Sequence, residues 1–302
     1  MMNIQDHKSG FVALIGRTNV GKSSFLNFLL KEKVSISSPK PQTTRQQIRG
    51  IYNTNDAQIV FIDTPGLHKP KHELGLFMND EALSTLNNVD IICWMVDATR
   101  DFGFAEDMII KYFQNIKVPI FLLINKIDLV KNKNKLMENV AKYHSQCKFV
   151  ETYYISSLTG EHIDDFILAL IKYLPKGPKY YPSGQITDQN ESFIMAEIIR
   201  EKVLHLLHEE VPHSIATSIE NIIYEENAPP QVNAIIYVER DSQKKILIGK
   251  DGIMLKEIGT LARRDINKTL GIKIHLNIWV KVEKDWRNKK RELHKLGYES
   301  KK

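Results

Sequence analysis

The chain has 302 residues, of which 42% are hydrophobic and 26% are charged, and its formal net charge is +6. These proportions are ordinary for a soluble globular protein and exclude a disordered or low-complexity chain. No apolar run reaches the roughly 18 residues that a membrane-spanning helix needs, and the polar N-terminus lacks the pattern of a secretory signal. We therefore expect a protein of the cytosol whose two cysteines, Cys93 and Cys147, stay reduced.

The charge is distributed unevenly along the chain. Residues 1–183 carry a net charge of +4, residues 184–239 carry −8 and residues 240–302 carry +10. A basic C-terminal region fits a polyanionic partner, such as RNA or an anionic membrane surface. On charge alone, a solvated basic face explains the pattern equally well.

Strand and helix patterns alternate through the first half of the chain. Strands are expected at residues 11–15, 47–52, 57–62, 90–96, 119–124 and 149–155, and helices at residues 22–31, 75–87, 105–115, 133–145 and 163–174. This alternation predicts a doubly wound α/β domain that binds ligands at the carboxyl ends of its strands. Residues 53–56, Asn-Thr-Asn-Asp, indicate a hairpin, so the second and third strands should be antiparallel within a mostly parallel sheet.

The stretch after the first expected strand fits the phosphate-binding pattern G-x-x-x-x-G-K-[ST] at every fixed position. Its residues are Gly16, Arg17, Thr18, Asn19, Val20, Gly21, Lys22 and Ser23. In such a loop, backbone N–H groups surround a polyphosphate at the start of a helix, the lysine reaches the β- and γ-phosphates, and the hydroxyl group binds Mg²⁺. We therefore predict a nucleoside triphosphate site in which Lys22 is a catalytic residue.

Two further segments are expected to sense the γ-phosphate. The third strand is followed by Asp63, Thr64, Pro65, Gly66 and Leu67. In that motif the carboxylate of Asp63 holds the Mg²⁺ shell, and the N–H of Gly66 meets the γ-phosphate. Thr43 and Thr44 are adjacent hydroxyl residues in the preceding loop, and we expect Thr44 to ligate Mg²⁺ together with Ser23. Residues 33–47 and 67–75 are thus expected to be switch loops that become ordered in the triphosphate state.

A motif after the fifth strand indicates which base is bound. It consists of Asn125, Lys126, Ile127 and Asp128. The carboxylate of Asp128 can accept hydrogen bonds from N1–H and the exocyclic amine of guanine, whereas adenine has no such pair of donors on that edge. The nucleotide is therefore predicted to be GTP or GDP rather than an adenine nucleotide. Ser156, after the sixth strand, is expected to lie near the guanine oxygen.

A segment rich in proline and glycine, residues 174–184, separates the two halves of the chain. It predicts a first domain over residues 1–175, a linker over 176–189 and a second domain over 190–302. In the second domain a helix at 191–209 should precede strands at 215–224 and 231–239. A helix-turn-helix segment and a strand at 273–282 should follow.

The turn in that helix-turn-helix segment contains a G-x-x-G loop. It consists of Ile248, Gly249, Lys250, Asp251 and Gly252, with the basic residues Lys244, Lys245 and Lys256 beside it. In KH domains such a loop clamps about four nucleotides, and unpaired bases expose the edges that the adjoining groove reads. We therefore predict binding of single-stranded RNA at these residues. The basic residues 286–291 suit rRNA phosphates, an anionic membrane surface or a solvated terminal helix.

Taken together, the motifs in Gly16–Ser23, Asp63–Gly66 and Asn125–Asp128 resemble those of the translation-factor-related small GTPases. Within that class, Pro41-Gln42-Thr43-Thr44-Arg45 and Asp63-Thr64-Pro65-Gly66-Leu67-His68 are similar to the Era family of bacterial GTPases. The resemblance extends over nearly the whole chain. It implies a P-loop GTPase domain with a mixed, mostly parallel sheet, followed by a smaller α+β KH domain of type II.

The resemblance also implies an activity and partners. A protein of this family hydrolyses GTP to GDP and phosphate with Mg²⁺ and binds the 3′ end of 16S ribosomal RNA through its KH domain. It assists maturation of the 30S subunit, in part at the inner face of the cytoplasmic membrane. The alternative is a scaffold, associated with RNA or a membrane, that uses GTP mainly as a structural or regulatory ligand.

One position departs from the Ras-type mechanism, in which a glutamine after the Asp-x-x-Gly motif orients the attacking water. Leu67 stands there and offers no polar group. Intrinsic hydrolysis should therefore be slow or depend on another group. The family resemblance suggests that Asn19 helps to hold K⁺ against the phosphates as a catalytic aid, and an ordinary loop role for Asn19 is the alternative.

Overall fold

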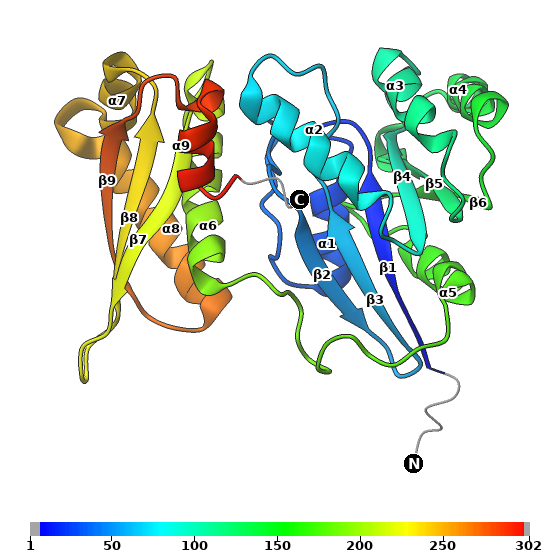
Figure 1. Ribbon diagram of the computed structural model, residues 1–302, viewed down its shortest axis with the longest axis horizontal. Coiled ribbons are helices and arrows are strands. Elements are labelled where there is room, and N and C mark those ends of the chain that lie inside the picture. Colours follow the sequence, from blue (N-terminus) through cyan, green and yellow to red (C-terminus); the bar gives the residue numbers. More distant parts are fainter. Residues whose placement is uncertain (1–6, 299–302) are drawn as a thin grey trace. The chain divides into compact units, whose positions relative to one another are not determined.

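The chain folds around two β-sheets, and each sheet belongs to a separate unit (Figure 1). The structure is a computed structural model that describes residues 7–298. The first unit comprises the chain up to Ser37, Thr44–Pro70 and Met78–Asp188. The second unit comprises Ser38–Thr43, Lys71–Phe77 and the chain from Gln189 onward.

The sheet of the first unit has six strands in the order β2-β3-β1-β4-β5-β6. The strands are β1 (Lys8–Ile15), β2 (Ile48–Asn53), β3 (Ala57–Asp63), β4 (Ile91–Asp97), β5 (Ile120–Asn125) and β6 (Glu151–Ile155). Only β2 is antiparallel to its neighbour, and Thr54 closes its hairpin by donating its N–H to the Ala57 carbonyl at 2.8 Å. The predicted α/β sheet with one antiparallel hairpin is confirmed.

Helices cover both faces of this sheet, which is why β4 and β5 are apolar along their length and buried at every position. The helices are α1 (Lys22–Leu30), α2 (Glu73–Thr85), α3 (Phe104–Phe113), α4 (Lys133–Gln146) and α5 (Ile163–Tyr173). One core contains residues of α2, α3 and α4 around Trp94, whose ring meets Phe113 and Tyr143 edge to face. On the other face, Phe25 of α1 contacts Phe166 of α5.

The segment after α5, in which the linker was predicted, is hydrogen-bonded to the edge strand β2. The Ile51 N–H donates to the Ile186 carbonyl at 2.8 Å, and the Thr187 hydroxyl donates to the Arg49 carbonyl at 2.7 Å. The Arg49 guanidinium forms an ion pair with Asp188 at 2.6 Å. Up to Asp188, the chain is therefore held on the first unit.

The second unit follows the predicted order of helix, two strands, two helices and strand. Its main elements are α6 (Glu191–Leu206), β7 (Ala216–Ile223), β8 (Gln231–Val238), α7 (Asp241–Ile248), α8 (Ile253–Leu270) and β9 (His275–Val282). Strand β8 pairs antiparallel with β7 and parallel with β9. This topology confirms the α+β KH arrangement of the second type.

The two faces of the three-stranded sheet differ in polarity. On one face, α6 and α8 pack on the sheet, where Ile199 and Ile258 share a core with Ile236. On the other face, an amide ladder crosses the strands, because Asn277 donates to Asn233 at 3.0 Å and Asn233 donates to Asn221 at 2.7 Å. The helix-covered face supplies the core, and the ladder satisfies polar groups on the uncovered face.

The basic C-terminal segment forms a short 3₁₀ turn (Trp286–Asn288) and α9 (Lys290–Lys295). Trp286 is fully buried and donates its indole N–H to the Ser214 carbonyl at 2.9 Å, and Leu293 is also buried. The apolar side chains of this segment therefore anchor it to the second unit. Within residues 7–298, no helix combines the length and apolar character needed to cross a bilayer.

Candidate functional site

Four of the predicted motifs meet at one edge of the six-stranded sheet. They begin at or directly after the carboxyl ends of β1, β3, β5 and β6, with Gly16, Asp63, Asn125 and Ser156 as their first residues. Parallel strands bring these ends together, and the crevice outside them is where such sheets bind ligands. The whole of this edge lies in the first unit.

The phosphate-binding loop is folded around the ammonium group of Lys22. Lys22 is buried, and its Nζ donates to the carbonyls of Gly16 at 3.2 Å and Arg17 at 3.1 Å. Burial lowers the pKa of Lys22 to about 8, against the opposing effect of the Asp63 carboxylate. A bound polyphosphate would add negative charge beside this ammonium and so favour its charged form.

Gly21 shows why the loop needs glycine before Lys22. Its φ is 105°, in the range that side chains rarely adopt, and a Cβ there would lie 2.2 Å from Nδ2 of Asn125. That amide nitrogen donates to the Val20 carbonyl at 2.7 Å. This hydrogen bond links the phosphate-binding loop to the base-recognition motif.

Three oxygen-bearing side chains converge at the predicted Mg²⁺ site. The hydroxyl oxygens of Ser23 and Thr44 are 2.8 Å apart, and Ser23 donates to Oδ2 of Asp63 at 2.7 Å. Oδ1 of Asp63 is buried and has no hydrogen-bond partner among the described residues. Burial raises the pKa of Asp63, although Lys22 and the hydroxyl groups oppose this effect. Hard oxygen donors and an unpartnered buried carboxylate oxygen fit Mg²⁺.

Of the two adjacent threonines, Thr44 is the one near this carboxylate. Its hydroxyl lies 3.4 Å from Oδ2 of Asp63, whereas the hydroxyl of Thr43 donates to the Lys40 carbonyl at 2.7 Å. The side chain of Thr43 is therefore satisfied within its own loop.

Sequence reasoning missed Ser35, which belongs to the same cluster. This side chain is fully buried and donates to Oδ2 of Asp63 at 2.8 Å. Asn27 of α1 fixes the backbone there, because its Oδ1 accepts the N–H groups of Val34 and Ser35 at 3.0 and 2.9 Å. A lone serine between two apolar residues carries no motif, so only the folded chain reveals its contact with Asp63.

The base-recognition residues are held by specific partners. Asn125 accepts the Ser157 N–H at 2.9 Å, and Asp128 accepts the Ser156 hydroxyl at 2.6 Å. Lys126 has a φ of 68° and donates to the Asn19 carbonyl at 2.7 Å. The predicted residues Asn125, Lys126, Asp128 and Ser156 are therefore brought together beside the phosphate-binding loop.

Asp97, at the end of β4, is a second residue that motif reasoning missed. Its Oδ2 lies 2.7 Å from Nζ of Lys126, and its Oδ1 accepts the N–H and hydroxyl of Thr99 at 2.9 and 2.6 Å. Burial alone would raise the pKa of Asp97, but the hydrogen bonds from Lys126 and Thr99 outweigh it and lower that pKa. Asp97 thus stays ionised and fixes the ammonium group of Lys126.

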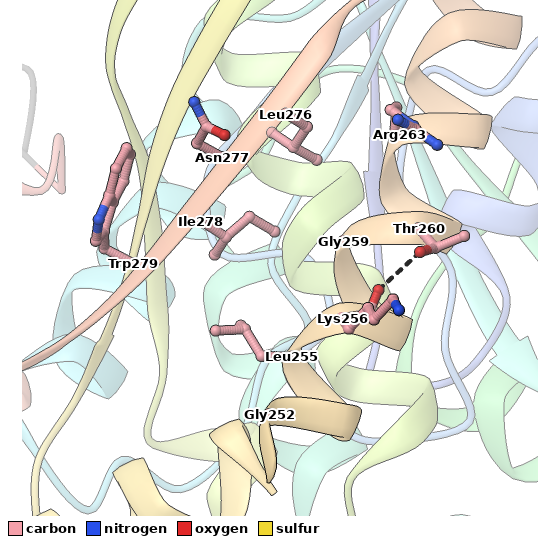
Figure 2. Close-up of a pocket in the computed structure, with 10 residues that line it drawn as sticks. All are labelled: Gly252, Leu255, Lys256, Gly259, Thr260, Arg263, Leu276, Asn277, Ile278 and Trp279. Carbon is pink, nitrogen blue, oxygen red and sulfur yellow. Dashed lines mark hydrogen bonds between the residues drawn. The ribbon is translucent and has the colours of Figure 1, made fainter.

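The second unit has a groove between α8 and β9 with a volume of about 600 Å³ (Figure 2). It is lined by Gly252, Leu255, Lys256, Gly259, Thr260, Arg263, Leu276, Asn277, Ile278 and Trp279. Figure 2 shows Leu276 and Ile278 on the side of β9 that faces α8, and Asn277 and Trp279 on its other side. The floor is apolar and the α8 side carries two cations, a combination that suits stacked bases and a phosphate backbone.

Only part of the predicted RNA site lines this groove. Gly252 and Lys256 do so, whereas the other predicted residues lie in the preceding turn and on α7. These are Lys244, Lys245, Ile248, Gly249, Lys250 and Asp251. Gly249 and Gly252 have φ values of 74° and 77°, so the turn that leads into α8 depends on both glycines.

Apart from Gly252 and Lys256, the residues that line the groove were not predicted. The positions 252, 256, 259 and 263 recur every three to four residues, which is the period of one helix face. That stripe was a signal available in the sequence, whereas the exposure of Trp279 on the edge strand appears only in the structure. The stripe identifies a groove only once α8 is known to lie beside β9.

Comparisons with known proteins recognise both units of the chain. A family model described as a 50S ribosome-binding GTPase matches residues 11–126, and a KH domain model matches residues 210–287. A crystal structure of an Era variant from Aquifex aeolicus bound to GDP–AlF4⁻ is 39% identical, with a TM-score of 0.91. The match covers 96% of this chain and 99% of that one.

A second solved structure is similar over the same extent. It contains Era in complex with MgGDPNP and nucleotides 1506–1542 of 16S ribosomal RNA. The identity is again 39% and the TM-score 0.91, with 97% of this chain and 99% of that chain covered. The similarity therefore includes the nucleotide-binding unit and the KH unit together.

Proposed function

The chain belongs to the Era family of GTPases, and from this premise we propose that it is a GTP-driven switch that binds the 3′ end of 16S rRNA and assists 30S subunit assembly. The observation that carries the proposal is the similarity at 39% identity across both units to an Era structure that holds MgGDPNP and 16S rRNA. The proposed site of action is the cytoplasm, where ribosomal subunits are assembled.

In the first unit, the proposed nucleotide is GTP. Lys22 contacts the β- and γ-phosphates, Gly66 meets the γ-phosphate, and Asp128 accepts the two donors of the guanine edge. Ser23, Thr44 and Asp63 would hold Mg²⁺, which supplies positive charge against the phosphates when it is bound. Loss of the γ-phosphate on hydrolysis removes the contact at Gly66 and so releases the switch segment.

The use of K⁺ at Asn19 remains a separate proposal. A monovalent cation beside the phosphates would stabilise the charge that develops on the leaving GDP, as an arginine finger does. The supporting observation is that Leu67 is apolar, so its side chain cannot orient the attacking water as the glutamine does in the Ras-type mechanism. Hydrolysis that is equally fast in Na⁺ and in K⁺ would exclude it.

In the second unit, the proposed RNA site is the groove between α8 and β9 together with the G-x-x-G turn. Its apolar floor, formed by Leu255, Leu276 and Ile278, suits unpaired bases, and Lys256 and Arg263 suit the phosphates. We further propose that ordering of the switch segments by GTP changes RNA affinity.

The scaffold alternative keeps GTP only as a structural ligand. The convergence of Lys22, Ser23 and Asp63 favours an enzyme, because a purely structural nucleotide site does not need the catalytic set. A peripheral membrane contact through the basic C-terminal segment is less well supported, since its Trp286 and Leu293 are buried.

The test is equilibrium binding of a short single-stranded RNA from the 3′ end of 16S rRNA, with a scrambled RNA of equal length as control. Fluorescence anisotropy should be recorded with GDP and with a non-hydrolysable GTP analogue at one salt concentration. The proposal expects sequence-dependent binding that is tighter with the analogue. Sequence-dependent binding that is identical in both nucleotides would disprove the coupling, and weak binding indifferent to sequence would favour the membrane or scaffold alternative.

A further inference from the structure

The residue that follows the Asp-x-x-Gly motif cannot orient a water molecule. Leu67 is only 2% exposed, and its side chain belongs to the hydrophobic core of the first unit. Its backbone is fixed beside the phosphate-binding loop, because its N–H donates to the Gly16 carbonyl at 3.2 Å and it forms a β-bridge with Arg17. The side chain thus points into the core, and a polar group that orients the attacking water must come from another residue.

The next residue, His68, offers such a group. Nδ1 of its ring lies 2.9 Å from the Gly66 carbonyl oxygen. Since a carbonyl only accepts, Nδ1 carries the hydrogen, and in the neutral ring Nε2 is left with a lone pair. Nε2 is buried and has no hydrogen-bond partner among residues 7–298. A buried acceptor without a partner in the protein calls for a water or ligand as its partner.

The position of His68 is fixed from two sides. Asn79 of α2 donates from Nδ2 to the His68 carbonyl at 2.8 Å, and its Oδ1 lies 3.4 Å from the His68 N–H. Gly66, whose carbonyl contacts Nδ1 of His68, is the second fixed point. A Cβ at Gly66 would lie 2.6 Å from the backbone of Thr18. Gly66 is therefore packed directly on the phosphate-binding loop, and the ring that bonds to its carbonyl is carried beside that loop.

The arginine of the phosphate-binding loop is already engaged. The Arg17 guanidinium donates to both carboxylate oxygens of Glu106 on α3, at 3.1 and 3.2 Å. Glu106 is buried and also caps the start of α3 by accepting the Gly103 N–H at 3.0 Å. This arrangement holds Arg17 against α3. Arg17 therefore does not act as an arginine finger on the phosphates.

We propose that Nε2 of His68 accepts a hydrogen bond from the water that attacks the γ-phosphate, and so orients it in place of the missing glutamine. In that step the water oxygen bonds to the γ-phosphorus while the bond from phosphorus to the β–γ bridging oxygen breaks. The electron pair of that bond leaves with GDP. The water proton that points at His68 ends on the released phosphate, so the histidine is unchanged after each turnover.

Two amide substitutions separate the roles of the two ring nitrogens. His68→Asn keeps an amide N–H near the place of Nδ1, and with it the hydrogen bond to Gly66, but ends short of Nε2. His68→Gln reaches the place of Nε2 with a polar amide. Lys69→Ala is the matched control, because Lys69 is the exposed neighbour in the same loop.

Single-turnover GTP hydrolysis and the affinity for a non-hydrolysable GTP analogue should be measured for each variant. His68→Asn is expected to lower the rate about 100-fold, the loss that a misplaced reacting group can cause, with analogue affinity within about twofold of wild type. His68→Gln should retain at least about a tenth of the rate, and Lys69→Ala all of it.

Three results would overturn the proposal. His68→Asn could hydrolyse GTP at the wild-type rate, His68→Gln could be as slow as His68→Asn, or the analogue affinity could fall as far as the rate. The last result would indicate that His68 only shapes the loop.

Discussion

In the first unit the groups that face the nucleotide lie on loops after β1, β3, β5 and β6, whereas in the second unit the groove is formed by the sides of α8 and β9. The loop groups are bonded to one another through buried carboxylates, as Ser23 is to Asp63 and Lys126 is to Asp97. The groove is open, and both of its charged side chains, Lys256 and Arg263, are exposed.

The difference predicts how the two sites respond to substitution. At the nucleotide site each charged group is proposed to contact one defined part of the ligand, so the loss of one group should remove most of the affinity. In the groove, the proposed affinity for RNA is spread over stacking and phosphate contacts, and single losses should be modest. The predictions below test this contrast, from the largest expected effect to the smallest.

Lys22→Ala should reduce GDP affinity by about 100-fold or more, because a hydrogen bond to a charged group contributes about 1.5–3 kcal/mol and several phosphate contacts are lost together. Titration with a fluorescent GDP derivative checks this. RNA affinity in the absence of nucleotide should be unchanged, and Lys111→Ala, an exposed residue of α3, serves as the control. Normal ribosomal RNA association by the Lys22 variant in cells would favour the scaffold alternative.

Asp128→Asn should lower GTP affinity about 100-fold and raise affinity for xanthosine triphosphate, because an amide can donate to the carbonyl that replaces the guanine amine. Competition between the two nucleotides for the purified variant measures the change. A variant that binds neither nucleotide would indicate that Asp128 mainly supports the Ser156 loop, to which it is bonded at 2.6 Å.

Arg263→Ala should weaken binding of the 3′-end RNA about 5- to 10-fold and reduce its salt dependence, because one phosphate contact is lost. Arg264→Ala is the matched control, since this neighbouring arginine has a 72% exposed side chain and does not line the groove. Equal effects of the two substitutions would mean that only net charge matters. GTP hydrolysis without RNA should be unaffected by either.

Asp97→Asn should speed GDP dissociation about fivefold, because the amide cannot hold the Lys126 ammonium as an ionised carboxylate does. Stopped-flow release of a fluorescent GDP derivative gives the rate. Arg100→Ala is the control, since Arg100 lies 3.6 Å from the same carboxylate and is half-exposed. If Asp97 acts through Lys126, the substitution should have little further effect in a Lys126→Ala background.

The sequence predicted the nucleotide site far better than the RNA site, and the reason is physical. Gly16–Ser23 and Asn125–Asp128 are contiguous because each motif wraps one part of the ligand, so their spacing is visible in one dimension. Ser35 and Asp97 reach the same site from other loops and have no such pattern. They act on Asp63 and Lys126, and that role appears only when distances are known.

In the second unit the order of helices and strands was predictable, but the groove was not. Arg263 and Asn277 are 14 positions apart, and they line one groove because α8 lies beside β9. The basic segment at the C-terminus also differs from a simple charged tail, since Trp286 is buried and donates a hydrogen bond to the carbonyl of Ser214. Charge counts describe composition, whereas these contacts depend on tertiary packing.

The most direct test of the two-site account is amide hydrogen exchange of the full chain, followed by mass spectrometry of its peptides. GDP with Mg²⁺ should protect peptides that span residues 16–23 and 125–128, and the 3′-end RNA should protect residues 249–263 and 275–282. The account would be contradicted if the RNA protected only residues 286–295 or the nucleotide loops, because the groove between α8 and β9 would then not be the RNA site.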